Sequence, residues 1–168
     1  MYPEEGAKGP KSNRASKFVK EAASRQIVGL VVFDGEKFLL LHRLLHWSGW
    51  EFPKGVIKES ESILEAIERE LFEETAIPKF EMVGKIDELD YFDDSRNLNY
   101  HIQNYLIRVS SNNRISFENQ SVKNSERVIE HDDFKWCFPK EAVLLLKHKN
   151  MKDTVKKAIK MLALETEK

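Results

Sequence analysis

Long hydrophobic runs, paired cysteines and a charge excess are all missing from this sequence of 168 residues. No apolar stretch reaches the roughly 18 residues needed to cross a bilayer, and the N-terminus lacks a signal-peptide core. The one cysteine, Cys137, excludes an intrachain disulfide and fits a reducing compartment. The net charge of -1 is not that of a protein that coats nucleic acid or an anionic membrane. We therefore expect a cytoplasmic protein with no membrane partner, and no pattern indicates an obligate protein partner.

The composition is that of a folded domain, with 41% hydrophobic and 33% charged residues. Residues 1–24 are rich in Pro, Gly, Ser and charge and have almost no apolar periodicity, which predicts a flexible tail. This tail is mildly basic, so weak phosphate binding is the alternative interpretation. Residues 25–168 are expected to form one domain.

The hydrophobic pattern predicts an α/β (α+β) fold. Residues 27–33 form a β-branched apolar run, and the Asp34-Gly35 turn should pair it with a second strand. A helix is predicted over 60–75, with Ser60 as its N-cap. Further strands are expected at 80–86, 89–92, 100–109 and 134–138, and further helices at 139–148 and 151–164. Because strands and helices do not alternate regularly, we expect one mixed sheet packed between helices.

The helix predicted over 60–75 carries carboxylates on the side where apolar residues are expected. At about 100° per residue, Glu74 projects only about 20° from Ile67, which should face the core, and Glu70 lies beside that stripe. A solvated charged face is the usual interpretation of a Glu-rich helix. Inward carboxylates, however, are costly unless a cation neutralises them, and clustered oxygen ligands suit Mg²⁺ or Mn²⁺. We therefore predict a divalent metal site here, with Arg69 pairing with Glu73 to orient the cluster.

The segment 55–77 carries a pattern of fixed spacing. A glycine is followed after five residues by a glutamate and after seven more by the helical acidic motif, in the order Gly55, Glu61, Arg69-Glu70-Leu71, Glu73-Glu74 and Ala76-Ile77. This pattern resembles the Nudix box in order and spacing. One position departs, because Ala76 stands where the family usually has glycine, and we expect a slightly altered helix end without loss of metal binding.

The resemblance implies an αβα sandwich that hydrolyses a nucleoside diphosphate linked to another moiety. It also implies that Glu70, Glu73 and Glu74 bind the divalent ions, together with the backbone carbonyl of Gly55. Metal ions would offset the pyrophosphate charge and activate a water, so the protein supplies mainly ligands and positioning groups. Glu73 and Arg69 are accordingly counted among the catalytic residues.

The residues before the box bear on the substrate. Trp50, Pro53, Lys54 and Gly55 form a Trp–x–x–Pro–Lys–Gly run that is similar to both diadenosine tetraphosphate (Ap4A) hydrolases and mRNA-decapping Nudix enzymes. The first resemblance implies that Trp50 and Lys54 lie at the nucleotide site, with Lys54 near the phosphates. Trp47 is the alternative stacking residue, and either tryptophan could instead cover the sheet.

A second motif begins at Glu130 and ends at Trp136, just before a Pro-initiated helix. It resembles the Glu-His–x–x–aromatic–basic–Trp segment of animal and archaeal Ap4A hydrolases, which implies that Glu130 is a further metal ligand or the catalytic base. Glu126 is the rival, since both glutamates precede a predicted strand. His131 is expected to brace the loop, and Trp136 to lie in the core.

Tyr91 matches a tyrosine that the Ap4A hydrolases use to stack on an adenine. The alternative is a strand-end tyrosine with its hydroxyl at the rim. Tyr100 departs from the family, because it stands roughly where a basic residue is usual, and Arg43 or Arg96 could compensate for that charge.

The sequence therefore predicts a metal-dependent hydrolase that converts dinucleoside tetraphosphates to ATP and AMP. The alternative enzyme is an RNA 5′-end pyrophosphohydrolase or a decapping enzyme, with RNA as the partner. A Nudix fold used only for binding would usually have lost box carboxylates, and here every acidic position is kept.

Overall fold

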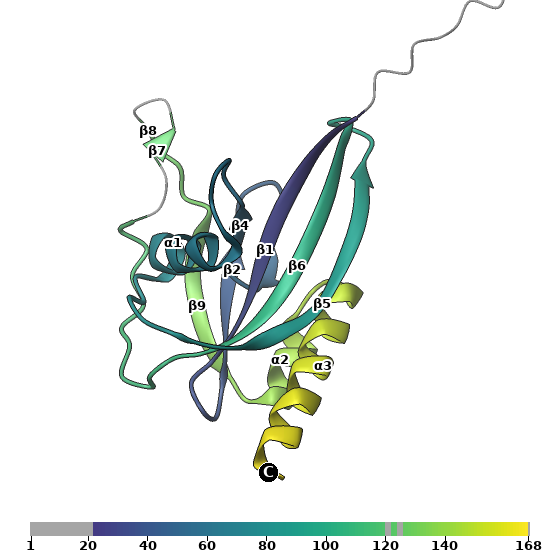
Figure 1. Cartoon of the computed structure of the whole chain (residues 1–168). Coiled ribbons are helices and arrows are strands. Elements are labelled where there is room, and N and C mark those ends of the chain that lie inside the picture. Colours follow the sequence, from purple (N-terminus) through teal and green to yellow (C-terminus); the bar gives the residue numbers. More distant parts are fainter. Residues whose placement is uncertain (1–21, 120–121, 124–125, 168) are drawn as a thin grey trace, which may run out of the picture.

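The computed structural model describes residues 22–119, 122–123 and 126–167, so most of the predicted tail lies outside it. The domain is already ordered at Ala23, where the first strand begins. The elements in chain order are β1 (Ala23–Phe33), β2 (Phe38–Arg43), β3 (Gly49–Glu51), β4 (Lys54–Val56), α1 (Ile63–Thr75), β5 (Glu81–Asp93), β6 (Leu98–Arg108), β7 (Val122–Lys123), β8 (Glu126–Arg127), β9 (His131–Cys137), α2 (Pro139–Leu145) and α3 (Lys149–Thr166) (Figure 1).

The main sheet is mixed, as predicted. Its strands follow the order β3-β2-β1-β6-β5, while β4 pairs with β1 and β9 with β2. The pair β1 and β6 is parallel, and the others are antiparallel. The predicted turn after β1 is present, because the Asp34 carboxylate accepts hydrogen bonds from the amides of Glu36 and Lys37, and Gly35 has a φ of 104°. The sheet therefore brings β4 and β6 to either side of β1.

Helices cover both faces of this sheet, which confirms the αβα sandwich (Figure 1). Alternate residues of β1 divide between two cores. Leu30 packs with Ile67 and Leu71 of α1, whereas Val31 packs with Val155 of α3. A continuously apolar strand is expected when both faces of a sheet are buried. No helix of the described residues is long and apolar enough to cross a membrane.

Helix α1 begins later than predicted. Its N-cap is Ser62 and not Ser60, because the Ser62 hydroxyl accepts from the Glu65 amide at 3.2 Å while the Glu65 carboxylate accepts from the Ser62 amide at 2.7 Å. Ser60 instead lies in a turn with a φ of 69°. The Ser-x-x-Glu spacing of a capping box was the sequence pattern that identifies this start.

The C-terminus of α1 keeps the conformation that glycine favours. Ala76 has a φ of 64° and ψ of 13°, and its amide donates to the Phe72 carbonyl at 2.9 Å. A left-handed backbone costs a residue with a Cβ about 1–2 kcal/mol. Alanine therefore strains this helix end, and the capping hydrogen bond from its amide is still made.

Strand β5 joins two segments that were predicted as separate strands. Its pairing with β6 is irregular between Met82 and Gly84 and again between Lys85 and Asp87. Such bulges shift the alternation of side chains, so the pattern of one long strand resembles that of two short ones.

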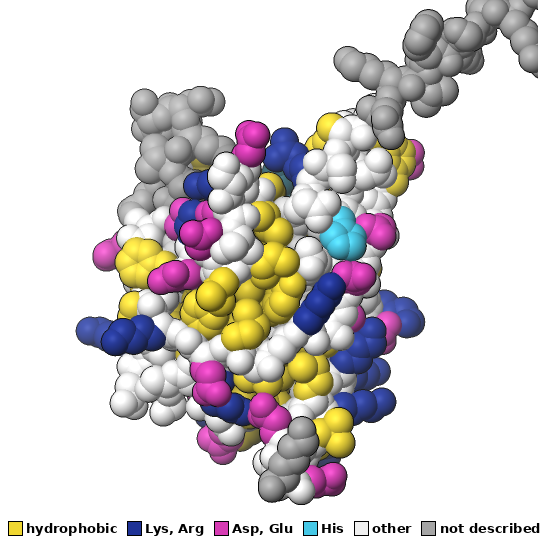
Figure 2. All heavy atoms as spheres, in the orientation of Figure 1, with side chains coloured by type: hydrophobic (Ala, Val, Ile, Leu, Met, Phe, Trp, Pro, Cys, Tyr) yellow, Lys and Arg dark blue, Asp and Glu magenta, His cyan; other side chains and the backbone are white. Residues whose placement is uncertain are grey.

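Figure 2 shows hydrophobic side chains gathered in the middle of the face that carries α1 and β5, with charged side chains around them.

Candidate active site

An open cavity of about 1020 Å³ lies over the sheet beside α1. Nine of the ten predicted site residues line it: Arg43, Lys54, Gly55, Arg69, Glu70, Glu73, Glu74, Tyr91 and Glu130. They come from β2, β4, α1, β5 and the segment just before β9. The tertiary structure thus brings together residues that are far apart in the chain.

Of the glutamates of α1, Glu70 and Glu74 are turned inward, as their positions on the helix predicted. Glu70 and Glu74 are 8% and 7% exposed, although glutamates are rarely buried. The Glu74 carboxylate accepts a hydrogen bond from the Lys54 amide at 3.0 Å, which links the helix to β4. A Cβ at Gly55 would lie 1.8 Å from the Glu70 carboxyl carbon, so any other residue there would displace the Glu70 carboxylate.

Burial without enough nearby positive charge raises the pKa values of Glu70 and Glu74. Burial raises the pKa of Glu70 to about 7, against the opposing hydrogen bond from Arg69. Burial also raises the pKa of Glu74 well above its usual range, and the charges of Glu130, Glu70 and Glu51 add to that effect. A cation among these carboxylates would relieve the cost. The hard oxygen donors of these carboxylates therefore fit a divalent ion such as Mg²⁺.

Arg69 organises the acidic face of α1. Its guanidinium donates to Glu61 at 2.5 and 2.9 Å, to Glu70 at 2.6 Å and to Glu73 at 3.2 Å. It also donates to the Val56 carbonyl at 2.9 Å. The predicted pairing with Glu73 is present, but the contacts to Glu61 and Glu70 are shorter. Arg69 therefore ties the helix to the chain that leaves β4.

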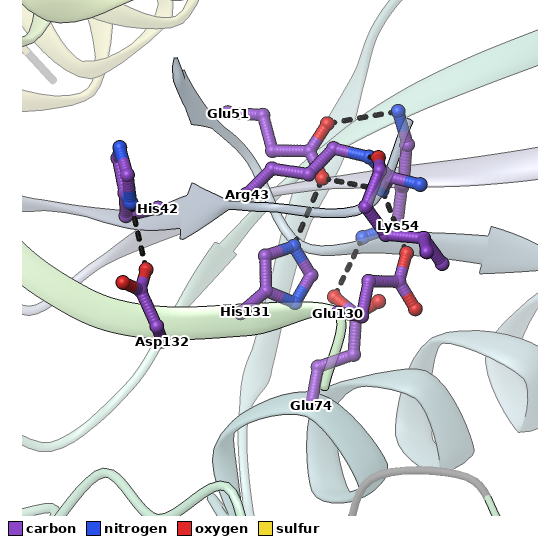
Figure 3. A network of polar contacts seen from close by, with 9 residues as sticks. His42, Arg43, Glu51, Lys54, Glu74, Glu130, His131 and Asp132 are labelled. Carbon is purple, nitrogen blue, oxygen red and sulfur yellow. Dashed lines mark hydrogen bonds and ion pairs between the residues drawn. The ribbon is translucent and has the colours of Figure 1, made fainter. Parts of the chain in front are cut away.

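A second polar network, centred on Glu51, lies beside the α1 carboxylates (Figure 3). Arg43 donates to Glu51 at 2.9 Å and to Glu130 at 2.6 Å. Lys54 donates to the other oxygen of Glu51 at 2.9 Å. His131 contacts Glu51 through Nε2 at 2.9 Å, so it braces this part of the chain as predicted.

Glu51 is the member of this network that sequence reasoning missed. Glu51 is fully buried. The sequence signal that could have identified it is a charged residue between two aromatic residues, Trp50 and Phe52. Glu51, Glu130 and His131 each offer a ligand atom within 4.8 Å of the others, as a metal site would. Because Lys54 and Arg43 already neutralise Glu51, we assign it to an ion-paired network.

The two tryptophans that precede β4, Trp47 and Trp50, take different places. Trp50 is the predicted site residue that does not line the cavity; its ring lies 5.1 Å from that of His42 and packs against the core under α2 and α3. Trp47 does line the cavity, with the Arg43 guanidinium 5.8 Å from its ring centre. The alternative weighed from the sequence, that Trp47 offers the stacking surface, is thus the one the geometry favours.

Tyr91 and Tyr100 form a stacked pair on the cavity wall. They are directly paired across β5 and β6, and their rings lie 4.8 Å apart with 16° between the planes. Tyr100 is 8% exposed, whereas Tyr91 is 47% exposed. Tyr100 therefore supports the ring of Tyr91 from below, and Arg96 also lines this part of the cavity.

The raised pKa of Glu70 predicts a pH-dependent stability of the protein freed of metal. Between about pH 4.5 and about pH 7 the folded protein holds a proton on Glu70 that the unfolded chain has released. Its free energy of unfolding should therefore fall as the pH rises through this range. Thermal unfolding in a chelator should show the fall, and Glu70→Gln should reduce it. A full slope in that variant would contradict the assignment.

A family comparison and sequence relatives agree with this geometry. The NUDIX domain model matches residues 23–159. An RNA pyrophosphohydrolase of Bartonella bacilliformis is 29% identical over 150 residues, which cover 76% of this chain and 88% of that protein. The RNA pyrophosphohydrolase of Thioalkalivibrio sulfidiphilus is 33% identical over 90 residues, 52% of this chain and 47% of that protein.

Solved structures share the fold at lower identity. A binary complex of the C. elegans Ap4A hydrolase has a TM-score of 0.67 at 22% identity and covers 83% of this chain and 98% of that one. The E. coli dihydroneopterin triphosphate pyrophosphohydrolase has a TM-score of 0.63 at 17% identity and covers 80% and 95%. These likenesses support the αβα arrangement and leave the substrate to be argued from the site.

Proposed function

This chain belongs to the NUDIX domain family and is a Nudix pyrophosphohydrolase, and we propose that it cleaves dinucleoside tetraphosphates such as Ap4A to ATP and AMP. The observation that carries the proposal is that carboxylates and aromatic rings line the same cavity. The carboxylates of α1 line it together with Trp47 and the ring of Tyr91. A substrate with a base at each end and phosphates between them matches this arrangement.

The α1 carboxylates are the proposed metal ligands. Glu70, Glu73 and Glu74 would hold the divalent ions, with the backbone carbonyl of Gly55. Bound Mg²⁺ or Mn²⁺ would offset the charge of the phosphates and lower the pKa of a water. Arg69 holds two of these carboxylates in place through its bonds to Glu70 and Glu73.

The cations of the second network are the proposed phosphate contacts. Lys54 and Arg43 line the cavity close to the α1 carboxylates, so both can face a polyphosphate held there. Glu130 is the proposed base or additional metal ligand, and its bond to Arg43 at 2.6 Å orients its carboxylate. The placement of Trp50 outside the cavity wall makes Trp47 the better candidate for stacking.

The substrate proposal predicts a specific role for Tyr91. Tyr91→Ala removes the exposed ring and should cost about 1–3 kcal/mol of binding, seen mainly as a higher KM for Ap4A. Tyr91→Phe should be nearly silent, because the ring and not the hydroxyl makes the stack. The measurement is the KM of the two variants, and an unchanged KM in Tyr91→Ala would contradict base stacking here.

An RNA 5′-end pyrophosphohydrolase is the second candidate, because both sequence relatives described above are RNA pyrophosphohydrolases. Such an enzyme should lose affinity when residues 8–20 are deleted, and its affinity should fall steeply with salt. This basic segment lies outside the described residues. A triphosphorylated RNA has a base on only one side of its 5′ phosphates. If that base stacks on Tyr91, no second base is left for Trp47.

One substrate panel separates the candidates. Ap4A, triphosphorylated RNA, capped RNA and ADP-ribose are incubated with Mg²⁺ or Mn²⁺, and the products are resolved by chromatography. We expect ATP and AMP from Ap4A at the highest kcat/KM. A higher kcat/KM on triphosphorylated RNA, abolished by deletion of residues 8–20, would instead identify the protein as an RNA 5′-end pyrophosphohydrolase.

A further inference from the structure

We propose that Glu51 is a positioning residue, whose buried carboxylate fixes Lys54 and Arg43 where they meet the phosphates of the substrate. The inference rests on the proposed function for the roles of those two cations. Glu51 itself is 0% exposed and does not line the cavity, so it acts through its neighbours.

Both oxygens of Glu51 are used by donors from separate parts of the chain. Oε1 accepts from Arg43 Nη1 of β2 and from His131 Nε2 of β9, each at 2.9 Å. Oε2 accepts from Lys54 Nζ of β4, also at 2.9 Å. Although burial opposes ionisation, the His131 hydrogen bond and the charges of Lys54 and Arg43 lower the pKa of Glu51 to about 2. The anion therefore holds three strands at one point (Figure 3).

The contacts of Lys54 show what this tether does. An ammonium has three N–H donors, and one of them is bound to Glu51 behind the cavity wall. The Lys54 side chain is 31% exposed and lines the cavity. A free lysine would lose considerable side-chain entropy on meeting a phosphate, whereas this one is already held in place.

Arg43 is held between two acids. Its Nη1 donates to Glu51 at 2.9 Å and to Glu130 at 2.6 Å, and its Nε donates to the Leu45 carbonyl at 2.8 Å. Removing the charge of Glu51 would leave Glu130 as the only anion among these three acceptors. The guanidinium would then shift toward Glu130, which would disturb both the phosphate contact and the proposed base.

The decisive variant is Glu51→Gln, which keeps the size and removes the charge. Its matched control is Asp87→Asn, because Asp87 is also a largely buried carboxylate that accepts from a lysine, Lys157, and from Asn104 and Thr154, but lies outside the cavity. Both variants are titrated with tripolyphosphate, which carries phosphates without a base, and assayed for kcat and KM. Thermal unfolding of both records the purely structural cost.

We expect Glu51→Gln to weaken tripolyphosphate binding about tenfold and to lower kcat/KM about 100-fold, the size of effect that misplaced binding groups produce. Asp87→Asn should lower the unfolding temperature while leaving both quantities within about twofold. Equal losses of binding in the two variants would show a general structural effect and overturn the proposal.

A double-mutant cycle tests the route of the effect. Because Glu51 acts through both Lys54 and Arg43, Lys54→Met combined with Glu51→Gln should lose less affinity for tripolyphosphate than the sum of the two single losses. Fully additive losses would overturn the proposal. If Glu51→Gln does not fold, Glu51→Asp keeps the charge but withdraws it by one carbon. Tripolyphosphate affinity should then fall several-fold, and an unchanged affinity would overturn the inference.

The result is separable from the substrate proposal. If Ap4A is not hydrolysed but Glu51→Gln still weakens tripolyphosphate binding, the substrate is wrong and the positioning role of Glu51 stands. If Ap4A is hydrolysed and Glu51→Gln binds tripolyphosphate as the unaltered protein does, the positioning role fails alone.

Discussion

Glu74→Gln should lower turnover at limiting Mg²⁺ by about three orders of magnitude, the largest loss that we expect from a single neutralised carboxylate. Glu74 is 7% exposed and lies against β4, where its carboxylate accepts from the Lys54 amide. Glutamine keeps the size and that hydrogen bond but removes the charge that would hold a divalent ion. Steady-state kinetics over a range of Mg²⁺ concentrations provide the measurement.

The same variant should behave in the opposite way when no metal is present. Burial raises the pKa of Glu74 well above its usual range, so a neutral amide there removes a cost and should raise the unfolding temperature in chelator. Glu68→Gln is the control, because Glu68 is an exposed glutamate of the same helix. Near-normal turnover of Glu74→Gln at limiting Mg²⁺ would remove Glu74 from the metal site.

Glu130→Gln should lower kcat about 100- to 1000-fold with little effect on folding, as expected for the loss of a general base. The motive is its place on the cavity wall and the bond at 2.6 Å that it accepts from Arg43. Glutamine can still accept that hydrogen bond, so the loop should keep its position. The kcat of the variant, measured at saturating substrate and Mg²⁺, reports the effect.

Glu126→Gln is the matched comparison for Glu130→Gln. Glu126 is in the short strand β8, four residues earlier, and it was the rival for the same role. We expect its kcat to change less than about threefold. The reverse ranking of the two variants would transfer the catalytic role to Glu126.

Much of the fold could be predicted because local patterns carried it. The apolar run of β1 and the Asp34-Gly35 turn reflect interactions within a few residues, and both were found as expected. The predicted helix start at Ser60 was wrong, because two serines precede the helix and Ser62, not Ser60, exchanges capping hydrogen bonds with Glu65. The length of β5 was missed because its two bulges depend on pairing with β6.

The site, like the fold, could be predicted only in part from the sequence. The positions of Glu70, Glu73 and Glu74 on one helix predicted which side of the helix they occupy, and the structure confirms that Glu70 and Glu74 are buried. Trp47 and Trp50 are three residues apart in a segment whose sequence has no periodicity, so no local pattern could say which ring faces the cavity. The register of β3 against β2 sets that orientation, with Trp50 opposite His42.

The sequence by itself determined the family, the acidic helix and nine of the residues on the cavity wall, because helical geometry and motif spacing are local properties of the chain. Only the tertiary structure decided the role of Glu51. Its three partners, Arg43, Lys54 and His131, come from three different strands. Glu51 stays ionised although it is buried, because several donors converge on it, and that convergence arises from the packing of the sheet.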